Sequence, residues 1–215
     1  MKKLLALLLA AAMLLTLCAC GNKNDQKDEG DTTPTYGDPP PEDIAAAAEA
    51  FIIAYCTQDK LTMFDMYCYD ALQQWKDKAV TESGKTEAEI CAEAQAQADE
   101  NGFTFDYPID TFDKYLQAYH EIDLQYKDEA YGAYTIKVEV LGSIEMTAER
   151  VAECRGIILG AGGDYADADA VGAITTIHEV TVRLLIEGEK KTKDETYSVY
   201  IANFKGEWHV AGHTT

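Results

Sequence analysis

The chain has 215 residues, of which 38 are acidic and 18 basic, and its formal net charge is −20 at pH 7. A surface this acidic repels phosphate backbones and anionic lipid headgroups, which excludes nonspecific nucleic-acid binding and membrane attachment through basic patches. Hydrophobic residues make up 47% and charged residues 26%, a balance typical of a folded globular protein. The length suffices for one domain with a sizeable core.

Residues 1–19 have the layout of a secretory signal peptide. Lys2 and Lys3 precede the apolar run Leu4–Leu17, in which Thr16 is the one polar residue. A membrane-spanning helix needs about 20 apolar residues, so this run is short for one. A basic start, an apolar run and then small residues are the features of a cleaved export signal.

The end of the run, Leu17-Cys18-Ala19-Cys20, resembles the lipobox of bacterial lipoproteins. The resemblance implies that Cys20 is diacylated on its sulfur, becomes the first residue after cleavage and anchors the protein in the cell membrane, on its extracytoplasmic face. The alternatives are an ordinary signal peptide with an incidental cysteine, or an N-terminal anchor.

Residues 20–41 are expected to form a lipid-anchored flexible tether. After Cys20 the segment is rich in polar residues, ends in Pro39–Pro41 and holds a single aromatic residue, Tyr36. Such a composition cannot bury a core. A tether of this kind would hold the acidic domain away from an acidic surface.

Helical spacing dominates the first half of the folded part. Apolar residues recur every three or four positions over 42–57 and 60–78, which predicts two amphipathic helices. The Thr86-x-x-Glu89 pattern is a capping box that opens a third helix, which ends near residue 100. We also expect a short helix over 110–118.

From His120 the apolar period changes to two. Alternation over 120–126 and over 134–140 predicts a hairpin with one buried face. The elements expected after it are a short helix over 147–158, a loop over 160–169, and strands over 174–186, 196–204 and 207–211. Helices followed by a meander of strands predict an α+β fold, with N-terminal helices packed on a curved antiparallel β-sheet.

This order of elements resembles the NTF2-like (cystatin-like) superfamily over about 42–212. The resemblance rests on the first helix with its ending Phe-Ile-Ile-Ala-Tyr-Cys-Thr-Gln-Asp, on the helix after it, and on the closing Lys-Gly-Glu-Trp-His-Val strand. It implies one domain over 42–215 with a pocket under the helices, of a type common in Firmicutes lipoproteins of unknown function. Isomerases and dehydratases of the superfamily use such a cavity, but no catalytic motif carries over to this chain.

Two histidines, His120 and His178, share the apolar phase of their predicted strands and are the candidate pocket residues. Two imidazoles in a pocket could bind a polar ligand or act as acid and base. Because both begin strands, a structural or rim position is the alternative interpretation. His209 and His213 are four residues apart, but on a strand end and a tail this spacing does not indicate a metal site.

A glycine-rich stretch at 160–163 lacks the lysine of a phosphate-binding loop. Asp164, Asp167 and Asp169 follow it and carry oxygen ligands that Ca²⁺ prefers. Their spacing matches no EF-hand, so a solvated acidic loop is the simpler interpretation. The sequence predicts no cofactor and no metal.

Besides the acylated Cys20, four cysteines remain after processing: Cys56, Cys68, Cys91 and Cys154. Export permits disulfides, and four cysteines allow three pairings. Cys56 and Cys68 fall on apolar faces of the predicted helices, which favours reduced, buried thiols. No spacing of Cys, His and Asn indicates a thiol nucleophile.

Together these patterns predict a membrane-anchored, extracytoplasmic lipoprotein of the cell envelope whose folded part is a non-catalytic ligand-binding or interaction domain. Its expected partners are the membrane, through the lipidated N-terminus, and a small molecule, a peptide or an envelope protein; nucleic acid is not among them. The alternative is an NTF2-like enzyme of the isomerase or dehydratase type that uses a cavity histidine. The tyrosines that suit an amphipathic binding surface include Tyr67, Tyr69, Tyr115, Tyr119 and Tyr126.

Overall fold

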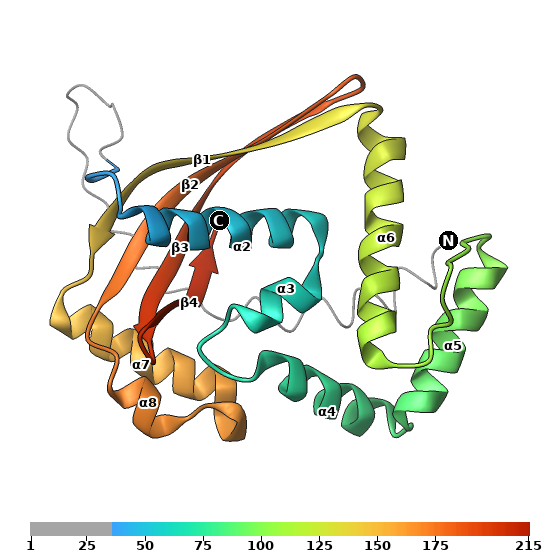
Figure 1. Ribbon diagram of the computed structural model, residues 1–215, viewed down its shortest axis with the longest axis horizontal. Coiled ribbons are helices and arrows are strands. Elements are labelled where there is room, and N and C mark those ends of the chain that lie inside the picture. Colours follow the sequence, from blue (N-terminus) through green and yellow to red (C-terminus); the bar gives the residue numbers. More distant parts are fainter. Residues whose placement is uncertain (1–35) are drawn as a thin grey trace.

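The structure, a computed structural model, describes residues 36–215 and has the α+β fold that the sequence predicts. Helices pack on a four-stranded antiparallel sheet of order β1-β2-β3-β4 (Figure 1). The predicted signal peptide and Cys20 lie outside the described residues, as does the predicted tether up to residue 35. Within residues 36–215, no helix combines the length and apolar character needed to cross a membrane.

The elements follow one another with short connections. The helices are α2 (Glu42–Thr57), α3 (Lys60–Asp65), α4 (Ala71–Ser83), α5 (Glu87–Glu100), α6 (Phe112–Tyr131), α7 (Ala148–Gly162), the 3₁₀ turn η2 (Gly163–Tyr165) and α8 (Ala168–Gly172). The strands are β1 (Tyr134–Glu145), β2 (Ile177–Gly188), β3 (Thr192–Phe204) and β4 (Glu207–Thr214).

The main core lies between α2 and one face of the sheet (Figure 1). Alternate residues of β2 are buried there, since successive side chains of a strand point to opposite faces. Large, fully buried side chains of this core include Phe51 and Ile52 of α2, Leu184 and Ile186 of β2, and Tyr197 and Ile201 of β3.

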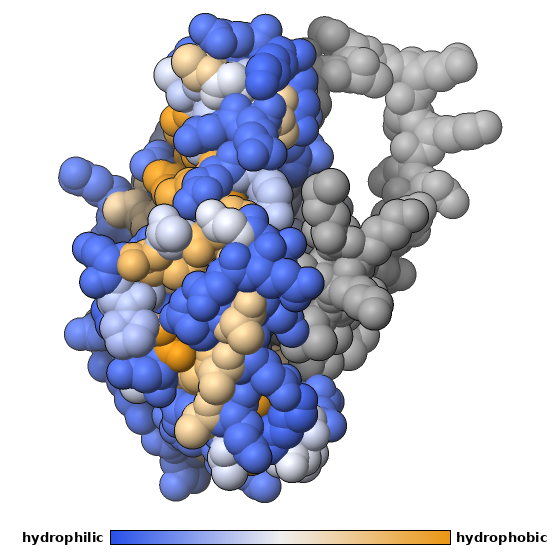
Figure 2. All heavy atoms as spheres, turned by 90° about the vertical axis from the view of Figure 1, so that its right-hand side faces the viewer, coloured by the Kyte–Doolittle hydropathy of each residue, from blue (hydrophilic) through white to orange (hydrophobic). Residues whose placement is uncertain are grey.

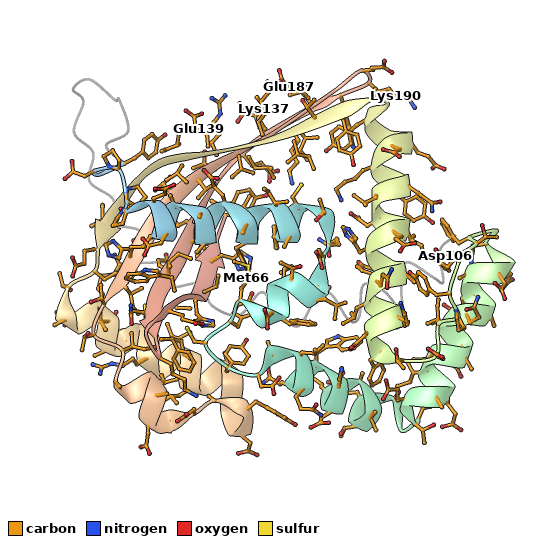
Figure 3. All side chains as sticks on the ribbon, in the orientation of Figure 1. Met66, Asp106, Lys137, Glu139, Glu187 and Lys190 are labelled. Carbon is orange, nitrogen blue, oxygen red and sulfur yellow. The ribbon has the colours of Figure 1, made fainter. Side chains whose placement is uncertain are left out.

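The opposite face of the sheet is covered only in part. Near the end of β3, Tyr200 and Ala202 join a second core with residues of α7 and α8, such as Ile158 and Val171. The remainder carries surface ion pairs, for example Arg183 with Asp194 at 2.7 Å. Figure 3 shows the exposed side chains of Lys137, Glu139 and Glu187 on the side of the sheet away from α2.

A third, smaller core holds α4, α5 and α6 together, and we call these helices the helical lobe. Its buried residues are Cys91, Ala98, Ile109, Phe112 and Ala118. Trp75 and Tyr115 pack against this core and against the main core, so they join the lobe to the sheet layer. Figure 2 looks at the side of the molecule on which α5 and α6 lie; hydrophilic atoms dominate it, with apolar atoms exposed between them.

The predicted helix over 60–78 is two helices. Between them the chain runs along the edge of the sheet, where the Cys68 amide donates to the Val210 carbonyl (3.2 Å) and the Val210 amide donates to the Met66 carbonyl (2.7 Å). Met66 lies between α3 and β4 in Figure 3. Asp70 then starts α4 by accepting a hydrogen bond from the Gln73 amide at 2.9 Å, the action of an N-cap.

The predicted strand over 120–126 is wrong, and with it the first hairpin. These residues belong to α6, which begins at the N-cap Thr111 and buries Phe112, Leu116 and Ile122 on one face. Alternating apolar residues fitted both periods over this short window, and tertiary contacts favour the helix. The strand predicted over 134–140 is confirmed within β1, but its partner is β2.

The loop predicted over 160–169 is also wrong in part. The helix predicted over 147–158 continues as α7 to Gly162, and η2 and α8 follow it. Asp167 caps α8, because its carboxylate accepts from the Ala170 amide at 3.0 Å. The predicted helix over 42–57, the capping box at Thr86 and the three C-terminal strands are confirmed.

Candidate functional site

A pocket of about 440 Å³ opens between the helical lobe, the C-terminal end of α7 and β4. Its volume is in the range of pockets that hold small molecules. α3 contributes Phe64, and α4 contributes Trp75. The α3–α4 segment, residues 66–70, contributes Tyr67 and Tyr69. We call this hollow the aromatic pocket.

The aromatic rings of the pocket stand in pairs. Tyr67 and Tyr69 stack with their centroids 5.5 Å apart, and Phe64 lies 6.1 Å from Trp75 at a tilt of 31°. Rings at such spacings hold one another in place. Since Trp75 also meets Phe112 of the lobe edge-on at 5.2 Å, the pocket wall is fixed from behind as well.

The face of α4 that lines the pocket follows from helix geometry. Ala71, Gln74, Trp75 and Lys78 are spaced i, i+3, i+4 and i+7, so they lie along one side of the helix. Gln74 donates from Nε2 to the carbonyl oxygens of Ala161 (2.6 Å) and Gly162 at the end of α7. This bridge fixes the distance between the two helices that flank the pocket.

Lys78 is the one charged side chain among the described residues that line the pocket. It also pairs with Glu82, one turn along α4, at 3.6 Å, and both side chains are well exposed. An exposed pair of this kind contributes little stability, so the ammonium can exchange this partner for another.

His213 lines the pocket from β4 and is half-buried. Its ring lies 4.8 Å from Tyr55 and 5.1 Å from Phe51, measured between centroids. Burial, aided by the nearby positive charge of Lys60, lowers the pKa of His213 below its usual value. A neutral imidazole facing a pocket can accept or donate one hydrogen bond to a ligand.

Sequence spacing alone gave no indication that His213 and His209 lie on different faces. Four residues apart on a regular strand, they would share a face. A bulge intervenes: Val210 pairs with Ile201 but Gly212 pairs with Tyr200, which leaves Ala211 unpaired. His209 therefore turns to the other face, where its ring lies 5.5 Å from Phe204.

An open groove of about 570 Å³ adjoins the aromatic pocket and shares Phe64 and Tyr69 with it. Its charged lining residues are Asp65 and Asp70, and we call it the acidic groove. The carboxylate of Asp70 is already engaged in capping α4. The aromatic pocket thus carries a positive side chain and the acidic groove carries negative ones, and the rings of Phe64 and Tyr69 lie between them.

The histidines predicted for the pocket lie elsewhere. His120 is on α6, and its Nδ1 is 2.7 Å from the Thr57 carbonyl at the end of α2. His178 does share the sheet face of Val180, but its ring packs edge-on against Trp208. Its Nδ1 atom is buried without a hydrogen-bond partner among the described residues. Neither lines the aromatic pocket or the acidic groove.

The three aspartates after the glycine-rich stretch do not converge. Asp167 caps α8 and pairs with Lys205 at 2.9 Å, and its pKa is lowered by these hydrogen bonds. Over residues 36–215, no group of three or more His, Cys, Asp or Glu side chains is placed to hold a metal ion.

All four cysteines of the folded part are buried and none of them forms a disulfide, in agreement with the expectation of reduced thiols. Cys68 departs from it in one respect, since it lies in the α3–α4 segment rather than on a helix. Burial raises the pKa of Cys68 to about 12 and that of Cys91 to about 11. Thiols of this kind stay protonated at neutral pH, so they are poor nucleophiles.

A cluster of titratable side chains surrounds Cys56, where the end of α2 meets α6 and β3. Lys127 pairs with Asp123, and Glu195 accepts from the hydroxyl of Tyr197. Burial and that hydrogen bond raise the pKa of Tyr197 to about 12. Burial also raises the pKa of the Cys56 thiol. Since the charged side chains pair with one another, we assign the cluster a structural role, in which it joins α6 and β3 at the end of α2.

Sequence reasoning found Tyr67 and Tyr69 as tyrosines of a binding surface, but missed the other pocket residues. Aromatic residues are dense between Phe64 and Trp75, and this density was the available signal. No protein-family model, curated protein or solved structure matches the chain. Its function is therefore argued from the pocket itself.

Proposed function

We propose that this chain is a membrane-anchored, extracytoplasmic lipoprotein whose folded part binds a small molecule with an apolar body, without transforming it. The observation that carries the binding function is the aromatic pocket, with four aromatic side chains around about 440 Å³. Concave, mostly apolar hollows with a few polar groups are the usual form of ligand sites.

The lining of the pocket favours binding over catalysis. General acid–base chemistry at neutral pH needs groups that hold and release protons in concert. The described residues around the pocket include one histidine and one lysine, and no carboxylate. The thiols of Cys56, Cys68 and Cys91 have raised pKa values, and none of the four cysteines lines the pocket.

The anchor part of the proposal rests on the sequence of residues 1–20. Palmitate labelling in a bacterial host checks it: the wild-type chain should take up label and a Cys20→Ala variant should not. Equal labelling of both would overturn the lipoprotein assignment. The resemblance to NTF2-like domains belongs to the same proposal, since helices over a curved antiparallel sheet are compatible with it.

Binding can be followed through the pocket's own tryptophan. The chain has two tryptophans, and Trp208 does not line the pocket but donates from its indole to Asp43 at 2.7 Å. A Trp208→Phe variant therefore leaves Trp75 as the sole indole. We expect 3-phenylpropanol, a neutral aromatic alcohol, to change Trp75 emission in a saturable way.

A filling variant supplies the control. Gly160 lines the pocket, and a Cβ added there would meet no atom within 4 Å. Gly160→Phe should abolish the response, whereas Gly156→Phe, on the same helix but outside the pocket lining, should retain it. A response that survives Gly160→Phe, or no saturable response in the parent, would contradict the proposed binding site.

The second candidate function is an NTF2-like enzyme of the isomerase or dehydratase type, and His213 favours it. A half-buried histidine with a lowered pKa in an apolar pocket can act as a general base. If ligands that bind the pocket exchange or lose a proton more slowly in a His213→Phe variant than in the parent, catalysis replaces simple binding as the function.

A further inference from the structure

The charge of the aromatic pocket is opposite to that of the whole chain. Acidic residues outnumber basic ones by 38 to 18, yet the one charged side chain among the described lining residues is Lys78. A cation in the pocket would face this ammonium at close range, whereas an anion would gain a charge-assisted hydrogen bond. The lining therefore discriminates by charge.

The position of Lys78 along α4 sets where the negative group must lie. Ala71 opens the pocket face of α4 and Lys78 is seven residues further, about 10 Å along the helix axis. Trp75 lies between them, one turn before Lys78. A ring seated against Trp75 and Phe64 would thus place a short acidic side arm at Lys78.

Two neighbouring features sharpen the charge preference. The carbonyl oxygens of Ala161 and Gly162, which would repel an anion at the end of α7, already accept from Gln74. The acidic groove begins on the other side of Phe64 and carries Asp65 and Asp70. A second negative charge at that end would meet these carboxylates, so the pocket suits one negative charge and not two.

We propose that the ligand of the aromatic pocket is a small monoanion with an aromatic ring, an arylalkyl carboxylate in chemical terms, whose ring lies against Trp75 and Phe64 and whose carboxylate accepts from Lys78. This inference rests on the proposed binding function and names its ligand class. It assigns Lys78 the role of a specificity-determining residue.

Three probes with one carbon skeleton test the inference: 3-phenylpropionate, 3-phenylpropanol and 3-phenylpropylamine. In the Trp208→Phe background, we expect the carboxylate to bind about tenfold more tightly than the alcohol, as one charge-assisted hydrogen bond would give. The amine should bind more weakly than the alcohol. Equal affinities for the three, or tightest binding of the amine, would overturn the inference while leaving the binding function intact.

Charge variants locate the effect. Lys78→Gln should remove the preference for the carboxylate and leave the affinity for the alcohol within about twofold. Lys76→Gln, which makes the same change on another side of α4 where the lysine pairs with Asp113, should retain the preference. A preference that persists in Lys78→Gln contradicts the assignment of Lys78. Absence of binding by all three probes contradicts the proposed function as well.

Discussion

The sheet layer and the helical lobe bury their side chains in different ways. Beneath α2 the core is built from large residues such as Phe51, Ile52 and Tyr197. Three of the five buried residues of the lobe core are small, namely Cys91, Ala98 and Ala118. A core of small side chains removes less apolar surface from water. Each large residue in it therefore contributes a larger share of the stability of the lobe. The aromatic pocket lies between the two regions and takes a wall from each.

The strongest test of this contrast is Phe51→Ala in the sheet layer. Phe51 is fully buried, with rings of Tyr55, Tyr67 and His213 around it. Truncation leaves a cavity, and we expect a loss of about 3–5 kcal/mol in the free energy of unfolding, measured with urea. Ile53→Ala, on the exposed side of the same helix, should cost far less; similar losses from both would contradict the core described.

The corresponding variant in the lobe is Phe112→Ala. Phe112 packs on Trp75 and is 1% exposed, so the loss is again up to about 3–5 kcal/mol, but we expect it to be local. Amide hydrogen exchange should quicken in α4, α5 and α6 and stay unchanged in β2 and β3. Uniform acceleration in both regions would show that lobe and sheet form one cooperative unit.

A smaller effect is expected at the start of α5. The Thr86 hydroxyl accepts from the Glu89 amide at 3.3 Å and the Glu89 carboxylate accepts from the Thr86 amide at 2.8 Å. Thr86→Ala should cost about 1 kcal/mol, again with exchange confined to the lobe. Thr86→Ser keeps the hydroxyl and should restore most of the loss; failure to do so would count against the cap.

The subtlest prediction concerns His213, at the boundary between the two regions. Because its pKa is lowered in the folded state, the unfolded chain takes up this proton first as the pH falls through about 6.5, and stability declines. His213→Phe should flatten this part of the stability profile. An NMR titration of His213 with a midpoint at or above the usual histidine value would contradict the lowered pKa.

Local signals in the sequence predicted the elements that depend on local physics. The helix over 42–57 follows from its apolar spacing, and the Thr86 cap from its motif. The α+β class follows from helices preceding strands. These predictions needed no knowledge of what each segment touches.

The errors arose where distant segments decide the outcome. The break after α3 exists because Met66 and Cys68 pair with β4, more than a hundred residues later in the chain. Residues 120–126 are helical as part of α6, which packs on α2, α3 and α5, although their alternation also fits a strand. His213 reached the pocket through the bulge at Ala211, and a bulge has no signature in this stretch of sequence.

The segment at Met66–Cys68 has one more consequence. An outer strand with free amide and carbonyl groups is a template on which another chain can add a strand and start an aggregate. In the middle of β4, the amide and the carbonyl of Val210 are both hydrogen-bonded to the α3–α4 segment. The residues that bring Tyr67 and Tyr69 to the pocket thus also cover β4 at Val210, where another copy of the protein could otherwise add a strand.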